Sequence, residues 1–325
     1  MCVVTFRPRC SLGVRPGPLD DRWDLYILRE RAENLRPWLL PLDDVVTIAM
    51  ALTDRQTRER EYFDEWISRQ EESPEVSFES VESAETRPWN PYWYVAQLAK
   101  ELYSSPSQRL LDFGCGFGYY SLLFARIGYQ VSGFDVSAKN IATAHQLAHR
   151  HGLAERTHFD VGTAETIQYA SDYFDICAGI DILHHVEIER SIRECFRILK
   201  PGGIALFKEP IAVPIFDPLR NSKFGTWLVP KERSFEQCVT DDERKLTVKD
   251  LAQIKEVFSN MKLQRFRLFS RVDAFWRRLR TLRQESQDQV DTLRKLEKFD
   301  AMCFNALPFL NAFGGEIVMI LEKPK

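Results

Sequence analysis

One short segment, Arg109–Asp135, constrains the fold of this chain more than any other. It reads RLLDFGCGFGYYSLLFARIGYQVSGFD: an apolar run, a glycine-rich turn, a helix-forming stretch and a second apolar run that ends in an acid. A short continuous apolar run is typical of a parallel strand that is buried on both faces. Glycine lets the turn adopt positive φ and lets the backbone approach a ligand closely. The segment therefore predicts two parallel strands joined by a helix, with a nucleotide pocket at the turn.

The acid that ends the second apolar run and the spacing of the glycines indicate which nucleotide is bound. Asp135 follows the glycines by about twenty residues. At this spacing a carboxylate can accept hydrogen bonds from both ribose hydroxyls of a bound nucleoside. Dinucleotide enzymes use the pattern G-x-G-x-x-G, whose third glycine would fall at Tyr119. The sequence therefore disfavours a nicotinamide dinucleotide.

The spacing that is present resembles the first motif of the class I S-adenosylmethionine-dependent methyltransferases, an acidic residue followed by G-x-G-x-G. In this chain the motif is Asp112, Gly114, Gly116 and Gly118. S-adenosylmethionine has no pyrophosphate, but it has a zwitterionic methionine end and a sulfonium. The resemblance implies that Asp112 faces the ammonium of this cofactor, directly or through water.

Later segments follow the order of motifs in the same family. His158–Glu165, HFDVGTAE, resembles the third strand and the loop beside adenine, where the family usually reads G-D-A-E. Thr163 replaces that aspartate, so its hydroxyl or the backbone of Ala164 is expected to contact adenine. Tyr173–Val186 resembles the fourth strand with the segment after it, and Lys200–Gly203 resembles the turn before the fifth strand.

The resemblance implies an α/β fold, a Rossmann-like seven-stranded sheet that is mostly parallel with an antiparallel last strand and helices on both faces. We expect a helical N-terminal extension or cap at residues 1–107 and the methyltransferase domain at 108–325. The domain is expected to hold a core at 108–210, a cap insertion at 211–246, and the completed sheet with inserted helices at 247–325. The part after the core loosely resembles the small-molecule members of the type 11 methyltransferase group.

Four flanking segments have patterns of their own. Helices are predicted at Asp54–Arg69 and Pro91–Tyr103. The acidic, serine-rich run Gln70–Glu85 is typical of a mobile surface loop. A long helical segment, Asp273–Asn311, is expected between the last two strands.

Ligands of open α/β sheets bind outside the carboxyl ends of the strands, where the strand order reverses. We expect the cofactor at the ends of the first three strands and the acceptor near the fourth and fifth. For Asp181 two roles stay open: contact with the substrate or the methionine end, or the cap of a helix. The expected cofactor-binding residues are Asp112, Gly114, Cys115, Gly116, Gly118, Asp135, Val136, Thr163, Ala164 and Asp181.

Methyl transfer asks the protein mainly to hold a nucleophile in line with the sulfonium methyl group and to exclude water. A hydroxyl acceptor also benefits from a general base, for which histidine has a suitable pKa. His184 and His185 follow the fourth strand, where each serves either as that base or as a hydrogen-bonding anchor of the loop. The candidate substrate residues are Tyr92, Tyr94 and Glu209; core packing is the alternative for the tyrosines and loop anchoring for the glutamate.

Two signals for other ligands are weak. His145 and His149 are four residues apart, but the glutamate of the H-E-x-x-H zinc motif is missing, so we expect no metal. Arg271–Arg283 is rich in arginine, and a solvated helix face is the usual explanation; an anionic substrate, a membrane surface or RNA is the alternative. The net charge of −3 gives no general attraction to nucleic acid, so no nucleic-acid partner is expected.

Cysteine usage and hydropathy bear on the compartment. The 7 cysteines include no C-x-x-C pair, which disfavours a disulfide framework and favours the reducing cytoplasm. The longest apolar window, Phe304–Leu321, is interrupted by polar residues, so we expect no membrane span, and no secretory signal is recognised.

We therefore predict an enzyme that moves the methyl group of S-adenosyl-L-methionine to a small-molecule or lipid-like acceptor, preferably at oxygen, and releases S-adenosyl-L-homocysteine. One alternative is an NAD(P)-dependent oxidoreductase. The other is a cofactor-binding protein without turnover that binds a partner. Nothing in the sequence names the acceptor or the oligomeric state.

Overall fold

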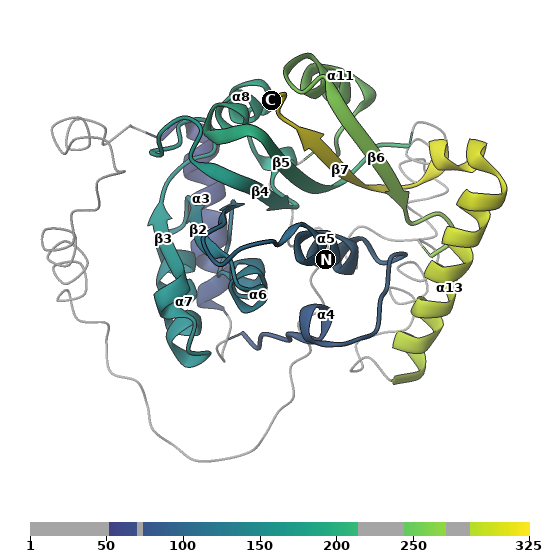
Figure 1. Ribbon diagram of the computed structural model, residues 1–325, viewed down its shortest axis with the longest axis horizontal. Helices are drawn as coiled ribbons and strands as arrows, with labels where there is room; N and C mark the ends of the chain where they lie inside the picture. Colours follow the sequence, from purple (N-terminus) through teal and green to yellow (C-terminus); the bar gives the residue numbers. More distant parts are fainter. Residues whose placement is uncertain (1–51, 70–73, 214–243, 271–286) are drawn as a thin grey trace, which may run out of the picture.

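A seven-stranded sheet of order β3-β2-β1-β4-β5-β7-β6 forms the centre of the molecule (Figure 1). The computed structural model describes residues 52–69, 74–213, 244–270 and 287–325. The strands are β1 Arg109–Phe113, β2 Gln130–Asp135, β3 Thr157–Val161, β4 Phe174–Ile180, β5 Leu199–Pro210, β6 Asn260–Phe266 and β7 Glu316–Glu322. Neighbouring strands pair in parallel from β3 to β5, whereas β7 runs antiparallel to both β5 and β6. The predicted fold class is confirmed.

Helices cover both faces of this sheet (Figure 1). They are α3 Asp54–Ser68, α4 Glu79–Glu82, α5 Pro91–Leu102, α6 Tyr119–Ile127, α7 Ala138–Arg150, α8 Ile188–Ile198, α11 Val248–Val257 and α13 Gln287–Ala306. Side chains alternate between the faces of a strand, so Leu110 and Leu111 of β1 belong to different hydrophobic clusters. The first cluster packs under α5, α6 and α7, and the second under α8 and α11. The sheet is therefore buried on both faces, as a parallel sheet requires.

Polar residues begin the helices that matter for the site. Thr53 and Gln56 form a capping box at the start of α3. Asn90 caps α5, whose first residue is Pro91, and Ser137 caps α7 directly after β2. These caps set the residues at which the three helices begin.

Some sequence predictions for the flanking segments need correction. The expected surface loop at Gln70–Glu85 contains the short helix α4, with Ser80 and Val81 buried, because Val81 joins the hydrophobic cluster under α5 and α6. The long helical segment before β7 is described as α13, followed by a 3₁₀ turn at Pro308–Phe313. Most of the expected cap insertion and the arginine-rich Arg271–Arg283 lie outside the described residues.

Candidate functional site

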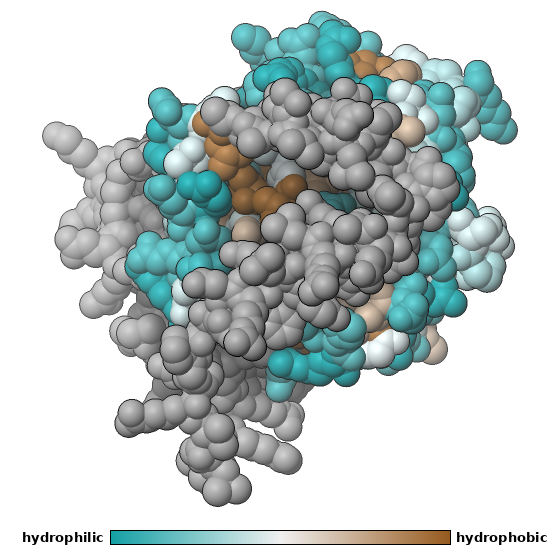
Figure 2. Space-filling view, turned by 90° about the vertical axis from the view of Figure 1, so that its left-hand side faces the viewer, coloured by the Kyte–Doolittle hydropathy of each residue, from teal (hydrophilic) through white to brown (hydrophobic). Residues whose placement is uncertain are grey.

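A pocket lies at the carboxyl ends of β1, β2 and β3, and we call it the strand-end pocket. The strand order reverses here, because β1 pairs with β2 on one side and with β4 on the other. It encloses about 470 Å³, including the solvent at its mouth. The face of the molecule that carries β3 and α3 shows hydrophobic side chains gathered in a hollow (Figure 2). The lining residues are Gln56, Glu59, Phe63, Gly114, Phe134, Asp135, Val136, Gly162, Thr163, Ala164, Glu165, Ile182, His185 and Val186.

The glycine turn lines the strand-end pocket at Gly114, whereas Gly116 and Gly118, also predicted to bind the cofactor, are not among the lining residues. Gly114, Gly116 and Gly118 have φ values of 74°, 52° and 86°, in the left-handed region that glycine tolerates. A Cβ atom at Gly114 would lie 2.5 Å from the side chain of Ile182, and one at Gly118 would lie 2.9 Å from the Cβ of Ala144. At Gly114 and Gly118 a side chain is thus excluded both by the neighbouring atoms and by the positive φ.

Asp135 is held firmly at the tip of β2. Its carboxylate accepts hydrogen bonds from the backbone N–H groups of Gly116 at 3.1 Å and Ser137 at 2.9 Å. It also accepts one from the side-chain amide of Asn140 at 3.2 Å. Burial raises the pKa of Asp135, and these three donors oppose that shift. The carboxylate therefore has a fixed orientation in the pocket wall, where the sequence analysis expected a ribose contact.

Asp112 and Cys115 lie among the buried residues beside the turn, and neither belongs to the set that lines the strand-end pocket. Asp112 is 2% exposed and accepts a hydrogen bond from the hydroxyl of Ser121 at 2.6 Å. Burial raises the pKa of Asp112 to about 7, in spite of that hydrogen bond. Burial likewise raises the pKa of the Cys115 thiol, which makes it a poor nucleophile.

Helix α3 covers the strand-end pocket with Gln56, Glu59 and Phe63, and none of its residues was among the predicted site residues. Arg55 and Gln56 both donate to the carboxylate of Glu165, each at 2.8 Å. Glu165 also accepts the backbone N–H of Glu187 at 3.0 Å, which ties the loop after β3 to the start of α8. One buried carboxylate thus joins the covering helix to two loops.

The other end of α3 rests on the start of α7 and on the glycine turn. The hydroxyl of Ser137 donates to the carboxylate of Asp64. The ring of Trp66 stacks on that of Phe117, with centroids 6.0 Å apart. A capping box at Thr53 begins this helix, but nothing in the local sequence indicates what the helix covers.

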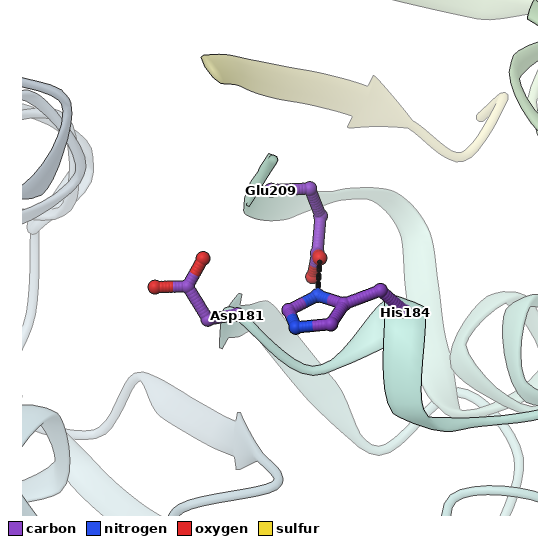
Figure 3. A group of neighbouring side chains, drawn as sticks. All are labelled: Asp181, His184 and Glu209. Atoms are coloured by element: carbon purple, nitrogen blue, oxygen red, sulfur yellow. Dashed lines mark hydrogen bonds and ion pairs between the residues drawn. The ribbon is translucent and has the colours of Figure 1, made fainter. Parts of the chain in front are cut away.

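His184 is held by a buried carboxylate beside Asp181 (Figure 3). Its Nδ1 atom lies 2.6 Å from Glu209 Oε2, and the Glu209 side chain is fully buried. The other oxygen of Glu209 accepts the backbone N–H groups of Ile182 at 2.9 Å and Leu183 at 2.7 Å. Glu209 therefore anchors the loop after β4, which was the alternative to its predicted contact with substrate.

His185 lies in different surroundings, in the wall of the strand-end pocket. Its Nδ1 atom is 3.1 Å from the carboxylate of Glu59 on α3, and its ring meets that of Phe63 edge-on at 5.7 Å. The centroids of the two histidine rings are 4.2 Å apart. His185 thus connects the loop after β4 to the helix that covers the pocket.

Asp181, directly after β4, belongs to a partly buried ionic network rather than to a helix cap. Its φ of 55° is left-handed, and its carboxylate accepts hydrogen bonds from Lys208 at 2.8 and 3.1 Å and from the Tyr92 hydroxyl at 3.0 Å. Burial alone raises the pKa of Asp181, but attraction to the Lys208 ammonium outweighs it and leaves the pKa below its ordinary value. Asp181 is therefore ionised at neutral pH.

The ionic network continues from Lys208 to α13. Lys208 is 2% exposed, and its ammonium lies 3.2 Å from the carboxylate of Glu316 on β7. Arg267 then bridges Glu316 at 3.7 Å and Glu297 of α13 at 3.2 Å. Asn90, the cap of α5, donates to Glu297 at 3.2 Å. The ends of β4, β5 and β6 are thus joined to α13 by charged side chains, and to α5 by the side chains of Asn90 and Tyr92.

Tyr94 and a group of possible metal ligands complete the description of the site. Tyr94, predicted near the substrate, packs against Phe266 at 5.5 Å in the hydrophobic cluster, because α5 turns it toward the sheet; this is the core alternative. Asp181, His184 and Glu209 bring ligand atoms within 4.8 Å of one another. The carboxylate of Asp181 already accepts from the ammonium of Lys208, and that of Glu209 accepts from two backbone N–H groups.

Known proteins resemble the part of the chain that forms this site. Residues 111–207 match the family model described as methyltransferase domain. Norajmaline N-methyltransferase of Rauvolfia serpentina is 30% identical over 146 residues, 43% of this chain and 48% of that protein. Ubiquinone biosynthesis O-methyltransferase of Sinorhizobium medicae is 35% identical over 139 residues, 42% of this chain and 55% of that protein. The chain spans about half the length of these curated relatives.

Solved structures share the fold over a longer stretch. Geranyl diphosphate C-methyltransferase from Streptomyces coelicolor A3(2), crystallised with Mg²⁺, geranyl diphosphate and S-adenosyl-L-homocysteine, matches with a TM-score of 0.54 at 12% identity. The match covers 84% of this chain and 100% of that one. At this identity the likeness shows the fold alone. It includes elements before and after residues 111–207, the segment that matches the family model.

Proposed function

We propose, from the premise that residues 111–207 belong to the methyltransferase domain family, that this chain transfers the methyl group of S-adenosyl-L-methionine to a small-molecule or lipid-like acceptor at oxygen. One observation carries the proposal. The strand-end pocket brings together Gly114, Asp135, Thr163 and Ala164 at the point where the strand order reverses. These residues come from three different strand ends, and their association is what an adenosyl cofactor requires.

Each part of the cofactor has a candidate partner. The fixed carboxylate of Asp135 would accept the ribose hydroxyls, and Thr163 with the backbone of Ala164 would contact adenine. Val136 contributes to the same wall. The backbone at Gly114 would face the methionine end, which approaches the sheet where Asp112 is buried.

The residues at the end of β4 support oxygen as the acceptor atom. Glu209 Oε2 lies 2.6 Å from Nδ1 of His184 and favours the tautomer that carries its proton on Nδ1, in which Nε2 holds the basic lone pair. We assign His184 as the general base and Asp181 with Tyr92 as the acceptor's polar neighbours. The acceptor oxygen attacks the methyl carbon and its proton passes to His184; the carbon–sulfur bond breaks, and its electron pair stays on sulfur as the thioether of S-adenosyl-L-homocysteine. His185 holds α3 instead.

The test follows a labelled methyl group from the cofactor into a fractionated extract of metabolites and lipids, and identifies the product by mass and fragmentation. His184→Gln is expected to lower kcat about 100-fold and to abolish the acidic limb of the pH–rate profile, because the base is lost. His185→Gln is the matched control and should keep that limb. A product labelled on nitrogen or carbon would refute the oxygen assignment, and an unchanged profile in His184→Gln would refute the assignment of His184 as the base.

Ligand-binding measurements beside this assay distinguish two other functions. Stabilisation against heat by NAD, with none by S-adenosyl-L-homocysteine, would indicate the oxidoreductase, since only a bound ligand stabilises the folded state. Tight binding of S-adenosyl-L-homocysteine with no labelled product in any fraction would indicate a binding protein without turnover. Tyr119, at the first position of α6, is the feature that disfavours the oxidoreductase.

A further inference from the structure

Lys208 places a positive charge inside the acceptor side of the sheet. It lies near the end of β5, and its side chain is 2% exposed. Burial lowers the pKa of Lys208, but attraction to the carboxylates of Asp181 and Glu316 outweighs it and leaves the pKa above its ordinary value. The side chain is therefore a charged ammonium at neutral pH, with three N–H donors and no acceptor.

The protons of this ammonium have partners inside the protein. Lys208 donates to Asp181 Oδ1 at 2.8 Å and to the hydroxyl oxygen of Tyr92 at 3.0 Å. It also forms an ion pair with Glu316 at 3.2 Å. Because three partners match three N–H groups and the side chain is buried, Lys208 does not donate to a bound acceptor molecule.

Lys208 also decides which way the hydroxyl of Tyr92 points. The Tyr92 oxygen accepts from Lys208, and its proton is donated to Asp181 Oδ2 at 3.0 Å. The ammonium lies 4.1 Å from the centre of the Tyr92 ring, which adds a cation–π attraction to the same pair. Turning the hydroxyl proton toward a bound molecule would break its bond to an ionised carboxylate. Tyr92 therefore accepts hydrogen bonds on this side and does not donate them.

The loop after β4 adds acceptors to the same side. Its first three backbone N–H groups are already used, that of Asp181 by the carbonyl oxygen of Lys208 and the next two by Glu209. The nitrogen of His184 that does not face Glu209 lies on the side of the ring toward Asp181 (Figure 3). A ring nitrogen of His184 and a carboxylate oxygen of Asp181 lie within 4.8 Å of each other. The assigned base and a second hydrogen-bond acceptor are therefore close together.

We propose that the methyl acceptor is a diol or an amino alcohol, with a second O–H or N–H group close to the hydroxyl that is methylated. This rests on the proposed function, in which His184 takes the proton of the reacting hydroxyl. The second group donates to the oxygens of Asp181 and Tyr92, which Lys208 holds in place. A carboxylate, phosphate or carbonyl group in its position would lose its hydration and meet only other acceptors, which is unfavourable.

The compounds that the protein selects from an extract provide the first test. Wild-type protein loaded with S-adenosyl-L-homocysteine is mixed with the fractionated extract of metabolites and lipids, and the retained compounds are identified by mass and fragmentation. The same fractions are treated with the enzyme and labelled S-adenosyl-L-methionine. We expect the retained compound to be the one that is labelled, and to carry the second O–H or N–H group. A retained compound that has only carbonyl, carboxylate or phosphate groups beside its hydroxyl overturns the proposal.

Asp181→Asn tests the polar surface itself, because the amide that replaces the carboxylate also donates. The identified compound is compared with an analogue whose second donor is replaced by a carbonyl or methoxy oxygen. Wild type should prefer the compound by at least about 100-fold in kcat/KM, and Asp181→Asn by less than about tenfold. A purely structural defect would lower both values alike. The matched control Asp175→Asn, at the other end of β4, breaks a pair with Lys200 at 2.7 Å and should keep the wild-type preference.

Binding of S-adenosyl-L-homocysteine, measured by calorimetry, reports that Asp181→Asn is folded, and an unchanged preference in the folded variant overturns the proposal. If Asp181→Asn does not fold, Tyr92→Phe takes its place. It removes one acceptor oxygen, so the preference should fall about tenfold. An unchanged preference in Tyr92→Phe then overturns the proposal in the same way.

The outcomes separate this proposal from the proposed function. A retained diol or amino alcohol that receives no label refutes methyl transfer but supports the inferred class of ligand, and the preference is then measured as a ratio of dissociation constants. A labelled hydroxyl compound without a second donor refutes this proposal and leaves methyl transfer to oxygen standing. An extract that yields neither a retained nor a labelled compound refutes both.

Discussion

At the scale of single residues, a buried acid at the glycine turn is held at a cost to stability. Asp112 is 2% exposed, and Ser121 is the side chain that donates to it. Its pKa of about 7 in the folded protein lies above the ordinary value of 3.8, so the folded state holds this proton more tightly than the unfolded chain. The contribution of Asp112 to the free energy of unfolding therefore falls as pH rises from about 4 to about 7, and then levels off.

Replacing Asp112 with asparagine should remove that penalty. We expect Asp112→Asn to raise the free energy of unfolding at pH 8 by on the order of 2 kcal/mol relative to wild type, and to leave it nearly unchanged at pH 4. Urea unfolding of both proteins at the two pH values measures this. The same variant should bind S-adenosyl-L-methionine more weakly if the acid serves the ammonium. Equal stability of the two proteins at pH 8 would contradict the burial argument.

The residues of the site differ in how much of the surrounding sequence is needed to predict them. The glycine turn and Asp135 were predicted because a strand, a turn and an acid follow one another along the chain, and their resemblance to class I methyltransferases is confirmed by the family match. Thr163 and Ala164 were predicted from their place in the same order of motifs, and they line the pocket. Whether these residues bind the cofactor as assigned stays a prediction.

At the scale of elements, the role of α3 in the site could not be predicted from the sequence. The sequence predicted this helix, but its contacts with the pocket join residues far apart, such as Arg55 and Glu165, which are separated by 110 positions. Pairings of this kind depend on how the elements pack and leave no periodic pattern in the sequence. The same holds for Lys208, whose neighbours Tyr92, Asp181 and Glu316 come from three separate elements.

Helix α3 should loosen when its anchor is removed. Arg55→Ala deletes one of the donors to Glu165, a carboxylate that is largely buried, so we expect faster hydrogen exchange of the α3 amides and weaker binding of S-adenosyl-L-homocysteine by about threefold to tenfold. The matched control is Arg69→Ala, which breaks an exposed ion pair with Glu65 and should change neither quantity. Equal exchange of α3 in Arg55→Ala and Arg69→Ala would show that Glu165 does not hold the helix.

At the scale of the whole molecule, the parts before and after residue 108 share one site. Helix α3 lines the strand-end pocket, and Tyr92 of α5 reaches Asp181 at the end of β4. Val95, Ala96 and Ala99 of α5 are fully buried in the same hydrophobic cluster as β1. The predicted boundary between an N-terminal extension and a domain at residue 107 therefore remains a proposal. It divides the sequence, whereas the core and the covering helices pack into a single structure.

The central claim is that the strand-end pocket binds an adenosyl cofactor through Asp135, and titration calorimetry with S-adenosyl-L-homocysteine tests it most directly. We predict saturable binding of one molecule per chain to the wild type, and at least about tenfold weaker binding to Asp135→Ala, because the ribose acceptor is lost. Asp160→Asn is the matched control: Asp160 lies on the neighbouring strand β3, contacts Tyr169 and His158, and should leave the affinity unchanged. Circular dichroism establishes that each variant is folded. No binding to the wild type, or equal affinity in folded Asp135→Ala, would contradict the account.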